Sequence, residues 1–385
     1  MTERPLGRRA LLTAVGGVVL AGCLDDGSEV GAYDGAGDDG REGQAGDDAT
    51  ATPDAAGDDH DAPFPVVEPT VPVHHELEEY LDEIRSGGVS EDGIPAIDDP
   101  KSMSADEADD LLDPGDPVFG VERNGEARAY PQRILVWHEI ANDELGGDPI
   151  AVTYCPLTGT AQGFERGDTT FGVSGQLLNS NVVLFDRETE SWWSQVLRVG
   201  IDGPLAGYEL SEFRVVWTTW ERWKELYPET TVLSDDTGHA RNYRSDPYGS
   251  YNPVGGYYEQ ERVIFWTMHH GDDRLRTKDV VIGARSEDGA IAVEKDYLRE
   301  KSIIDAETDA GVPHVVVYDP TLDTGYVYRN PDELAVDADG DGYAVDGDGP
   351  HEPKALPLDR VLAVDAMWFA WYAFYPDSTL VKDDE

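Results

Sequence analysis

Basic residues are scarce in this sequence: 29 Lys and Arg stand against 79 Asp and Glu, which gives a net charge of −50 over 385 residues. A surface this acidic repels nucleic acids and anionic membrane surfaces, so neither is an expected partner. The acidic residues are spread along the chain, as in proteins of salt-loving organisms, where molar salt shortens the Debye length to about 3 Å. Any single Asp or Glu is therefore expected to be a solvated surface group.

Long apolar segments are scarce as well. The apolar run at residues 10–21 is shorter than the about 20 residues that a mature membrane-spanning helix needs. It follows a twin arginine and ends in L-A-G-C, a combination that is typical of an export signal with a lipobox. We therefore expect residues 1–23 to be a signal, and Cys23 to carry the lipid that anchors the exported protein to the outer face of the cytoplasmic membrane.

Only two cysteines occur in the chain, at positions 23 and 155. With Cys23 lipidated, Cys155 is the one thiol expected to be free. A lone thiol exposed at a cell surface would oxidise, so Cys155 is expected to be buried or bound to a ligand.

Composition divides the rest of the chain into two parts. Residues 24–65 are rich in Asp, Gly, Ala and Thr and almost lack large apolar residues. Such a segment cannot bury enough surface to offset its ordering entropy, so it is expected to be a disordered acidic tether. Residues 66–385 include the nine Trp and are expected to form a single globular domain. The expected class is a β-rich α+β fold, with mainly antiparallel sheets and a few short helices.

Local signals place several elements within this domain. Asn124-Gly125 between two short apolar runs predicts a hairpin at residues 117–130, and S-x-x-E at Ser104 is a capping box that begins a short helix. Apolar spacing predicts the remaining elements, which are strands at 150–154, 263–268 and 280–284 and helices at 75–85, 218–227 and 366–375. The last helix, with Asp365 as its expected N-cap, is apolar nearly all round and is therefore expected to be buried.

The strand that leads into Cys155 has a counterpart later in the chain. P-I-A-V-T-Y-C-P-L-T-G-T at Pro149 resembles P-H-V-V-V-Y-D-P-T-L-D-T at Pro313, with several identities at one constant offset. The match suggests two β-rich repeat units, near residues 117–200 and 280–330, packed about a pseudo-two-fold axis. A chance recurrence of strand and turn residues is the alternative.

The register of this match also distinguishes the two units chemically. Ser302 stands where the first unit has His138, and Asp319 stands where it has Cys155. If the duplication is real, the units share a structure and only the first kept the reactive groups.

Several long motifs resemble those of a known family. They are W-H-E-I-A-N-D-E-L-G-G at Trp137, A-V-T-Y-C-P-L-T-G-T-A at Ala151, F-G-V-S-G-Q-L-L-N-S-N-V-V-L-F-D-R-E-T at Phe171, S-W-W-S-Q at Ser191, T-T-W-E-R-W-K-E-L-Y-P at Thr218 and W-F-A-W-Y-A-F-Y-P at Trp368. Over residues 118–380 the chain resembles the exported proteins grouped as domain of unknown function 3179 (DUF3179). The resemblance implies export and one shared fold, but no mechanism. Many members carry a second cysteine in a C-P-L-C motif, and Thr158 at that position here excludes a disulfide or a two-thiolate metal site within the motif.

Cys155 is a candidate nucleophile. It follows an apolar strand and precedes a turn of small residues, a geometry that suits an acyl-transfer or hydrolase reaction. His138 is expected to act as its base and to lower the pKa of the thiol from the usual value of about 8.5. Asp143, or Asn142, would orient that histidine. The alternative is that Cys155 is a small buried apolar residue.

Two kinds of metal site are also predicted. Sulfur and imidazole nitrogen suit copper or zinc, although the spacing of these residues matches no known signature. An acidic D-x-D-x-D-G run has the oxygen spacing of a structural calcium loop, with an acidic insertion as the alternative because the usual glutamate is missing. The expected copper or zinc ligands are Cys155, His138, His269 and His270, and the expected calcium ligands are Asp337, Asp339, Asp341 and Asp348.

Polar and aromatic side chains near Cys155 could also bind a ligand without catalysing a reaction. The expected ligand-binding residues are Ser174, Asn179, Asn181, Arg187, Trp193 and Gln195. The leading interpretation is a cell-surface lipoprotein whose ligand or metal site centres on His138 and Cys155, and a cysteine-dependent enzyme is the alternative. Both interpretations require the thiol and the imidazole to meet in one cavity. The sequence does not identify a protein partner.

Overall fold

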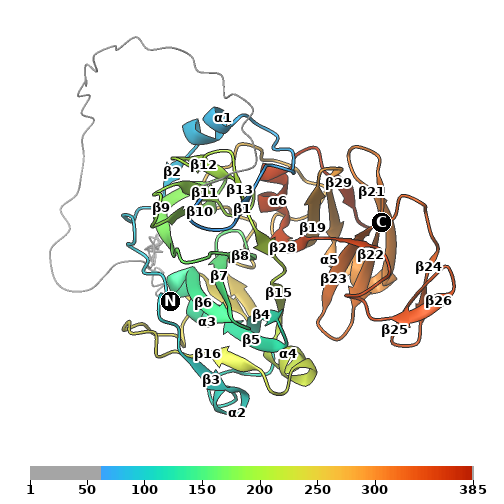
Figure 1. The fold of residues 1–385 in the computed structure, drawn as a ribbon, viewed down its shortest axis with the longest axis horizontal. Coiled ribbons are helices and arrows are strands. Elements are labelled where there is room, and N and C mark those ends of the chain that lie inside the picture. Colours follow the sequence, from blue (N-terminus) through green and yellow to red (C-terminus); the bar gives the residue numbers. More distant parts are fainter. Residues whose placement is uncertain (1–61, 384–385) are drawn as a thin grey trace, which may run out of the picture.

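The structure is a computed structural model that describes residues 62–383 (Figure 1). The predicted signal, the lipidation site Cys23 and most of the predicted tether therefore lie outside the described residues. Within them, antiparallel sheets dominate and the helices are short, which confirms the predicted β-rich α+β class. None of these helices is both long and apolar enough to cross a membrane.

The first of two similar units contains the strand that ends at Cys155. Its two sheets have the strand orders β14-β8-β7-β6 and β15-β4-β5-β16, the second with β3 at its edge. The predicted hairpin is confirmed as β4 and β5, which turn at Asn124 and Gly125 with φ angles of 52° and 81°. The elements are β3 (Ser102–Ser104), β4 (Pro117–Arg123), β5 (Glu126–Pro131), α3 (Gln132–His138), β6 (Ile140–Leu145), β7 (Asp148–Cys155), β8 (Thr160–Glu165), β14 (Glu212–Phe213), β15 (Val216–Thr219), α4 (Trp220–Leu226) and β16 (Thr231–Leu233).

The second unit repeats this topology on the other side of the molecule (Figure 1). Its sheets have the orders β27-β23-β22-β21 and β28-β19-β20-β29, and in each unit the last strand of the second order runs parallel to its neighbour. The elements are β19 (Val280–Ser286), β20 (Gly289–Glu294), α5 (Lys295–Lys301), β21 (Ile303–Glu307), β22 (Pro313–Asp319), β23 (Thr324–Arg329), β27 (Asp359–Val361), β28 (Ala363–Met367), α6 (Trp368–Phe374) and β29 (Thr379–Val381).

The same tryptophan–glycine contact packs a helix on a sheet in both units. Trp223 of α4 covers Gly120 of β4, and Trp371 of α6 covers Gly283 of β19. Each indole N–H donates to a hydroxyl group seven residues further along the chain. The duplication therefore includes β15-α4-β16 and β28-α6-β29, two segments that the sequence match did not pair.

The helices α3 and α5 correspond as well, and their ends correct the sequence register. Each helix is followed by a residue with positive φ, which is Glu139 at 58° and Ser302 at 66°. Ser302 therefore corresponds to Glu139 and not to His138. The reason is that paired residues of the two strands after the helix are 13 positions apart in the first unit, as Ile140 and Thr153 are, and 14 apart in the second, as Ile303 and Val317 are.

Each unit carries an insertion. In the first, a five-stranded sheet has the order β12-β11-β10-β9-β2, and in the second a three-stranded sheet has the order β24-β25-β26. The remaining described elements are β1 (Val66–Val67), α1 (Leu77–Asp82), β2 (Arg85–Ser86), α2 (Ala105–Ala108), β9 (Phe171–Leu178), β10 (Asn181–Asp186), β11 (Trp192–Ser194), β12 (Gly200–Asp202), β13 (Glu209–Leu210), β17 (Gly249–Tyr251), β18 (Val254–Gly256), β24 (Val336–Asp339), β25 (Gly342–Val345) and β26 (Asp348–His351). The predicted capping box before α2 is confirmed.

The strand predicted at residues 263–268 is not formed. The backbone of this segment forms hydrogen bonds with side chains and not with a neighbouring strand. The Ser180 hydroxyl donates to the Phe265 carbonyl at 2.9 Å, and the Met268 N–H donates to Asn179 Oδ1 at 2.7 Å. Its apolar residues therefore cover the core as an irregular segment.

The N-cap predicted for α6 is also wrong. Asp365 lies in β28, and its buried carboxylate accepts hydrogen bonds from Arg214 at 3.1 Å and Lys295 at 2.9 Å. The helix begins at Trp368, after Met367. A carboxylate that neutralises two partly buried cations is not free to cap a helix end.

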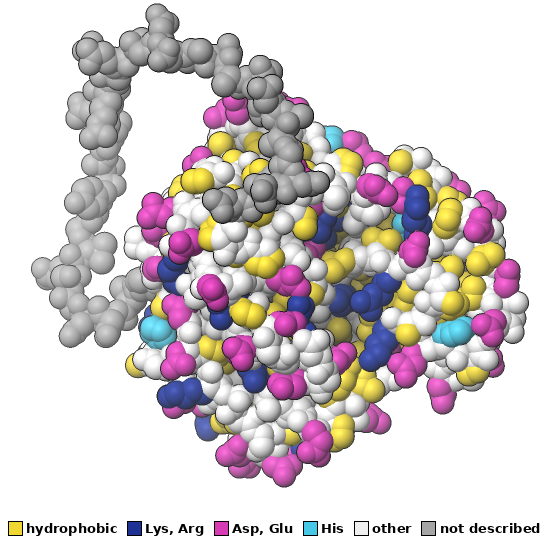
Figure 2. Space-filling view, viewed as in Figure 1, with side chains coloured by type: hydrophobic (Ala, Val, Ile, Leu, Met, Phe, Trp, Pro, Cys, Tyr) yellow, Lys and Arg dark blue, Asp and Glu magenta, His cyan; other side chains and the backbone are white. Residues whose placement is uncertain are grey.

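Charge is unevenly distributed over the surface. Figure 2 shows Asp and Glu side chains scattered over the visible face, and a group of Lys and Arg side chains in the hollow between the two units, with others spread over the first unit. The scattered carboxylates agree with the solvated acidic surface that the composition predicts.

Candidate functional site

Cys155 ends β7 and is buried, with 1% of its surface exposed. Its thiol lies 3.8 Å from the Ser180 carbonyl oxygen. Burial, with a smaller contribution from the nearby Glu139 carboxyl, raises the pKa of the thiol to about 11. The neutral thiol is therefore the stable form, which is the opposite of what an activated nucleophile needs.

His138 ends α3 and is also buried. Its Nδ1 lies 2.7 Å from the Pro95 carbonyl oxygen, to which it can only donate, so Nε2 accepts from the Tyr243 hydroxyl at 2.6 Å. Burial lowers the pKa of His138 to about 4, which keeps the imidazole neutral. Both ring nitrogens are occupied, and the described residues include no hydrogen bond between His138 and Cys155.

Asp143 does not orient His138. It lies in β6, where its carboxylate accepts from Arg128 Nη1 at 2.6 and 2.7 Å and from the Tyr130 hydroxyl at 2.8 Å. The carboxylate is thus committed to a partly buried ion pair. The expected thiol–imidazole–carboxylate arrangement is replaced by separate hydrogen-bond networks.

Two of the predicted ligand-binding residues form a buried network between the strands. Asn181 Nδ2 donates to Gln195 Oε1 at 2.7 Å, and Gln195 Nε2 donates to the Thr153 hydroxyl at 2.8 Å. Hydroxyls of Thr158 and Thr160 complete this network. Since these groups satisfy one another, they stabilise the interior and leave no free donor for a ligand.

The other predicted ligand-binding residues also have partners within the protein. The Ser174 hydroxyl donates to the Val183 carbonyl at 2.6 Å, Asn179 Nδ2 to the Ala373 carbonyl at 3.0 Å, and Trp193 Nε1 to Asp186 at 3.0 Å. Arg187 is half-buried and pairs with Asp92 and Asp98 at 2.8 and 3.2 Å. These contacts hold loops and strands together.

Glu139 is a notable residue that the sequence did not single out. It is buried beside Cys155 in a left-handed backbone conformation, and among the described residues no hydrogen bond or ion pair reaches its carboxyl group. Burial raises the pKa of Glu139 to about 8. Its carboxyl group is therefore largely protonated at neutral pH.

A cluster of three histidines brings distant parts of the chain together. His74 and His75 precede α1, and His269 lies in the loop before the second unit. One potential ligand atom from each lies within 4.8 Å of the others. Among groups of three or more His, Cys, Asp or Glu in the described part of the chain, these three histidines are the one group whose ligand atoms converge in this way. The predicted ligand His269 thus joins His74 and His75, and not His138 or Cys155.

Carboxylates orient two of these imidazoles. His75 Nδ1 lies 2.8 Å from Glu79 and His74 Nδ1 lies 3.0 Å from Asp377, which leaves Nε2 of each ring as the nitrogen without a carboxylate partner. A carboxylate on the second nitrogen is the usual support of a metal-binding histidine. His75 Nε2 lies 2.8 Å from His269 Nε2.

One pair of nitrogens in the cluster has a spacing close to that of a metal site. Two nitrogens bound to one tetrahedral ion at about 2.0–2.1 Å lie about 3.3 Å apart. The distance of 2.8 Å between His75 Nε2 and His269 Nε2 would therefore open by about half an ångström. Burial and the two neighbouring imidazoles lower the pKa of His269, which favours its neutral form.

The other predicted metal ligands lie elsewhere. His270 is exposed, with its ring 6.2 Å from that of Trp266. The predicted calcium loop forms the hairpin β24–β25, in which Asp339 pairs with Gly342 across the turn. The carboxylates of this region are exposed, and among the described residues no three of them bring their oxygens together, because the extended hairpin spreads them along its strands and turn. They are Asp337, Asp339, Asp341 and Asp348.

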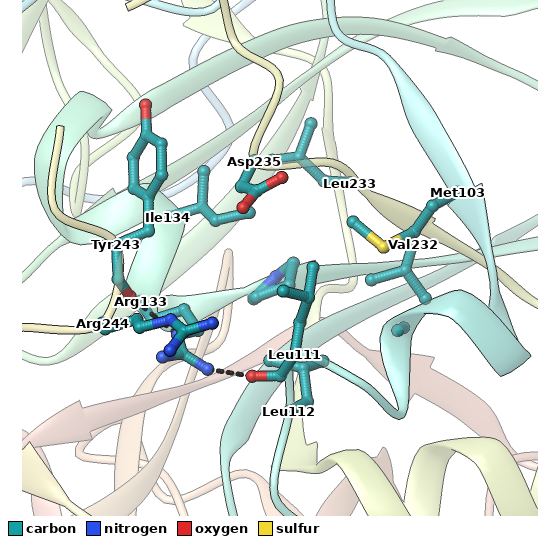
Figure 3. Close-up of a pocket in the computed structure, with 12 residues that line it drawn as sticks. Met103, Leu111, Leu112, Arg133, Ile134, Val232, Leu233, Asp235, Tyr243 and Arg244 are labelled. Atoms are coloured by element: carbon teal, nitrogen blue, oxygen red, sulfur yellow. Dashed lines mark hydrogen bonds between the residues drawn. The ribbon is translucent and has the colours of Figure 1, made fainter. Parts of the chain in front are cut away.

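Tyr243, the partner of His138, also forms the wall of a pocket (Figure 3). The pocket is a mainly apolar, partly open space of ≈30 Å³, and Arg133 donates to the Leu111 carbonyl at its edge. Figure 3 shows the Tyr243 hydroxyl pointing away from Leu111, and this hydroxyl is the one that lies 2.6 Å from His138 Nε2. His138 thus positions a pocket wall. Its two hydrogen-bond partners lie 43 and 105 residues away in the sequence, so no local pattern predicts this role.

Residues 91–378 match the family described as protein of unknown function DUF3179. No curated protein and no solved structure matches the chain.

Proposed function

The chain belongs to the DUF3179 family, whose description states no activity, and from its own residues we propose that it is an exported, lipid-anchored protein that binds a transition-metal ion. The ion would be held by His74, His75 and His269. The observation that carries the proposal is the convergence of three imidazoles from segments far apart in the sequence, two of them supported by carboxylates.

The chemistry of the cluster favours copper or zinc. Neutral imidazole nitrogens suit both metals, whereas calcium and magnesium prefer oxygen ligands. Without a metal, one of the two close Nε2 atoms of His75 and His269 must donate a proton to the other. An ion would replace that proton and would accept the lone pair of one imidazole nitrogen from each of the three histidines.

Location is part of the proposal. The twin arginine, the short apolar run and Cys23 support export and anchoring by lipid at the outer face of the cytoplasmic membrane. The acidic surface fits high salt and argues against a nucleic-acid partner.

Metal analysis of protein purified without chelators tests the proposal. Wild-type protein should retain about one copper or zinc ion per chain, because three imidazoles already converge there. His269→Ala should lose it. His270→Ala, a change of the neighbouring exposed histidine, and Cys155→Ser should both keep it. Equal metal retention by wild type and His269→Ala would reject the site. Loss of the metal in Cys155→Ser would instead assign the Cys155 thiol as a ligand.

The alternative of a cysteine-dependent enzyme has less support. The thiol of Cys155 is sealed by burial, its pKa is raised to about 11, and the imidazole of His138 is bonded to other groups. No second function is therefore proposed for this pair.

A further inference from the structure

A pocket of ≈300 Å³ adjoins the histidine cluster. His269 belongs to both, since its ring lines the pocket while its Nε2 faces His75. Besides Glu261 and Asp272, the rest of the wall is formed largely by four aromatic side chains. They are Phe265, Trp266, Phe369 and Tyr372. Trp266 is 48% exposed and is one of four large apolar side chains that stand out on the surface of the described residues.

We propose that an ion bound at the cluster keeps one coordination position open toward this pocket, and that the pocket takes a small flat ligand with a metal-binding head group. The inference rests on the proposed metal site. Three protein ligands leave the fourth position of a tetrahedral ion to water or to a ligand, as in sites that bind or convert small molecules. A ligand in that position would exchange with the bound water, and its flat body would pack on the aromatic wall.

The lining determines which kind of ligand fits. Aromatic rings bind flat apolar groups by stacking and edge contacts, and a space of this size suits a compact molecule of one or two rings. A second pocket of ≈300 Å³ reaches the cluster through His74, but its wall carries Arg285, Glu287 and Asp309, and Tyr375 is its one aromatic side chain besides that histidine. A flat apolar body therefore favours the side of His269.

Cobalt-loaded full-length protein gives a direct test, because the visible spectrum of Co²⁺ changes when a ligand enters its coordination sphere. The probes are imidazole and 4-phenylimidazole, which share a head group and differ by one ring. Both should change the spectrum of the wild-type protein. The phenyl ring should tighten binding about tenfold or more, since it is removed from water against the aromatic wall.

Two variants assign the effect to one pocket. Trp266→Ala should remove most of the advantage of 4-phenylimidazole while leaving imidazole binding unchanged. Val73→Ala, in the wall of the second pocket, should leave both affinities as in the wild type. Loss of the phenyl advantage in Val73→Ala alone, or equal affinities of the two probes for the wild type, would overturn the inference.

The outcomes also separate this inference from the metal site itself. If Co²⁺ does not bind, the metal site is wrong and the pocket loses its basis. If Co²⁺ binds and neither probe alters its spectrum, the metal site stands, but its coordination sphere is closed and the ligand site is rejected.

Discussion

At the scale of single residues, burial decides the chemistry of the Cys155 region. The expected reactive pair was inferred from proximity in the sequence, but His138 and Cys155 are held by different partners. The alternative, a small buried apolar cysteine, is what the structure shows. Buried beside the thiol, Glu139 has the more unusual environment, because its carboxyl group has no partner among the described residues.

Glu139 predicts a pH dependence of stability. Since burial raises its folded pKa from 4.5 to about 8, the folded state holds a proton that the unfolded state releases. The stabilising contribution is complete below pH 4.5 and is lost as the pH rises toward 8. Glu139→Gln stays neutral, so its unfolding free energy relative to wild type should rise by about 3 kcal/mol between pH 5 and pH 8.

Denaturant unfolding of both proteins at one high salt concentration measures this difference. Constant salt keeps the repulsion among the many surface carboxylates equal in wild type and variant. Parallel stability profiles of the two proteins over this pH range would show that Glu139 is ionised in the folded state.

The histidine cluster could be predicted only in part. The two His-His pairs, at 74–75 and 269–270, are visible in the sequence, and His269 was a candidate ligand. Which residues would join it depends on a contact that spans 194 positions, between His75 and His269. No local pattern encodes such a separation, so the sequence predicts Cys155 and His138 as the partners of His269 and not His74 and His75.

At the scale of elements, the duplication gives matched positions for comparison. Gly283 and Gly120 each lie under a tryptophan ring, and a Cβ at these positions would approach the ring to 2.2 and 2.1 Å. Gly283→Ala and Gly120→Ala should each destabilise the protein by about 1–3 kcal/mol or more, because the indole must move within a packed core.

Thermal unfolding checks this pair against a permissive glycine. Gly255→Ala is the control, since nothing lies within 4 Å of an added Cβ there. Its melting temperature should equal that of the wild type. An unchanged melting temperature for Gly283→Ala or Gly120→Ala would mean that the two tryptophans do not pack as closely as the structure shows.

Elements with local signals were predictable and those with distant partners were not. The hairpin at Asn124-Gly125 and the capping box at Ser104 each depend on a few adjacent residues, and both are formed. The apolar segment 263–268 has the composition of a strand, but the side chains of Asn179 and Ser180 take up its backbone groups. The partners of Asp365 are likewise remote in sequence.

At the scale of the whole molecule, the N-terminal sequence and the charge are the basis of the proposed location, and the folded part is the basis of the proposed metal binding. Anchoring and metal binding should therefore be separable by mutation. Cys23→Ser removes the expected lipid attachment but no residue of the folded units. It should therefore move the protein from the membrane fraction to the medium while leaving its metal content per chain unchanged.

Cell fractionation in the native host, followed by metal analysis of the released protein, checks both halves. Membrane-bound Cys23→Ser protein would contradict the lipid anchor. Released protein without metal would link the metal to the membrane and not to the three histidines.

X-ray absorption spectroscopy of the zinc-loaded or copper-loaded protein identifies the atoms around the ion. Binding by His74, His75 and His269 predicts nitrogen or oxygen neighbours at about 2.0 Å with the outer-shell scattering of imidazole rings. Loss of that imidazole signal in His269→Ala would complete the assignment. A sulfur neighbour at about 2.3 Å would instead place the metal on Cys155 and contradict the site proposed here.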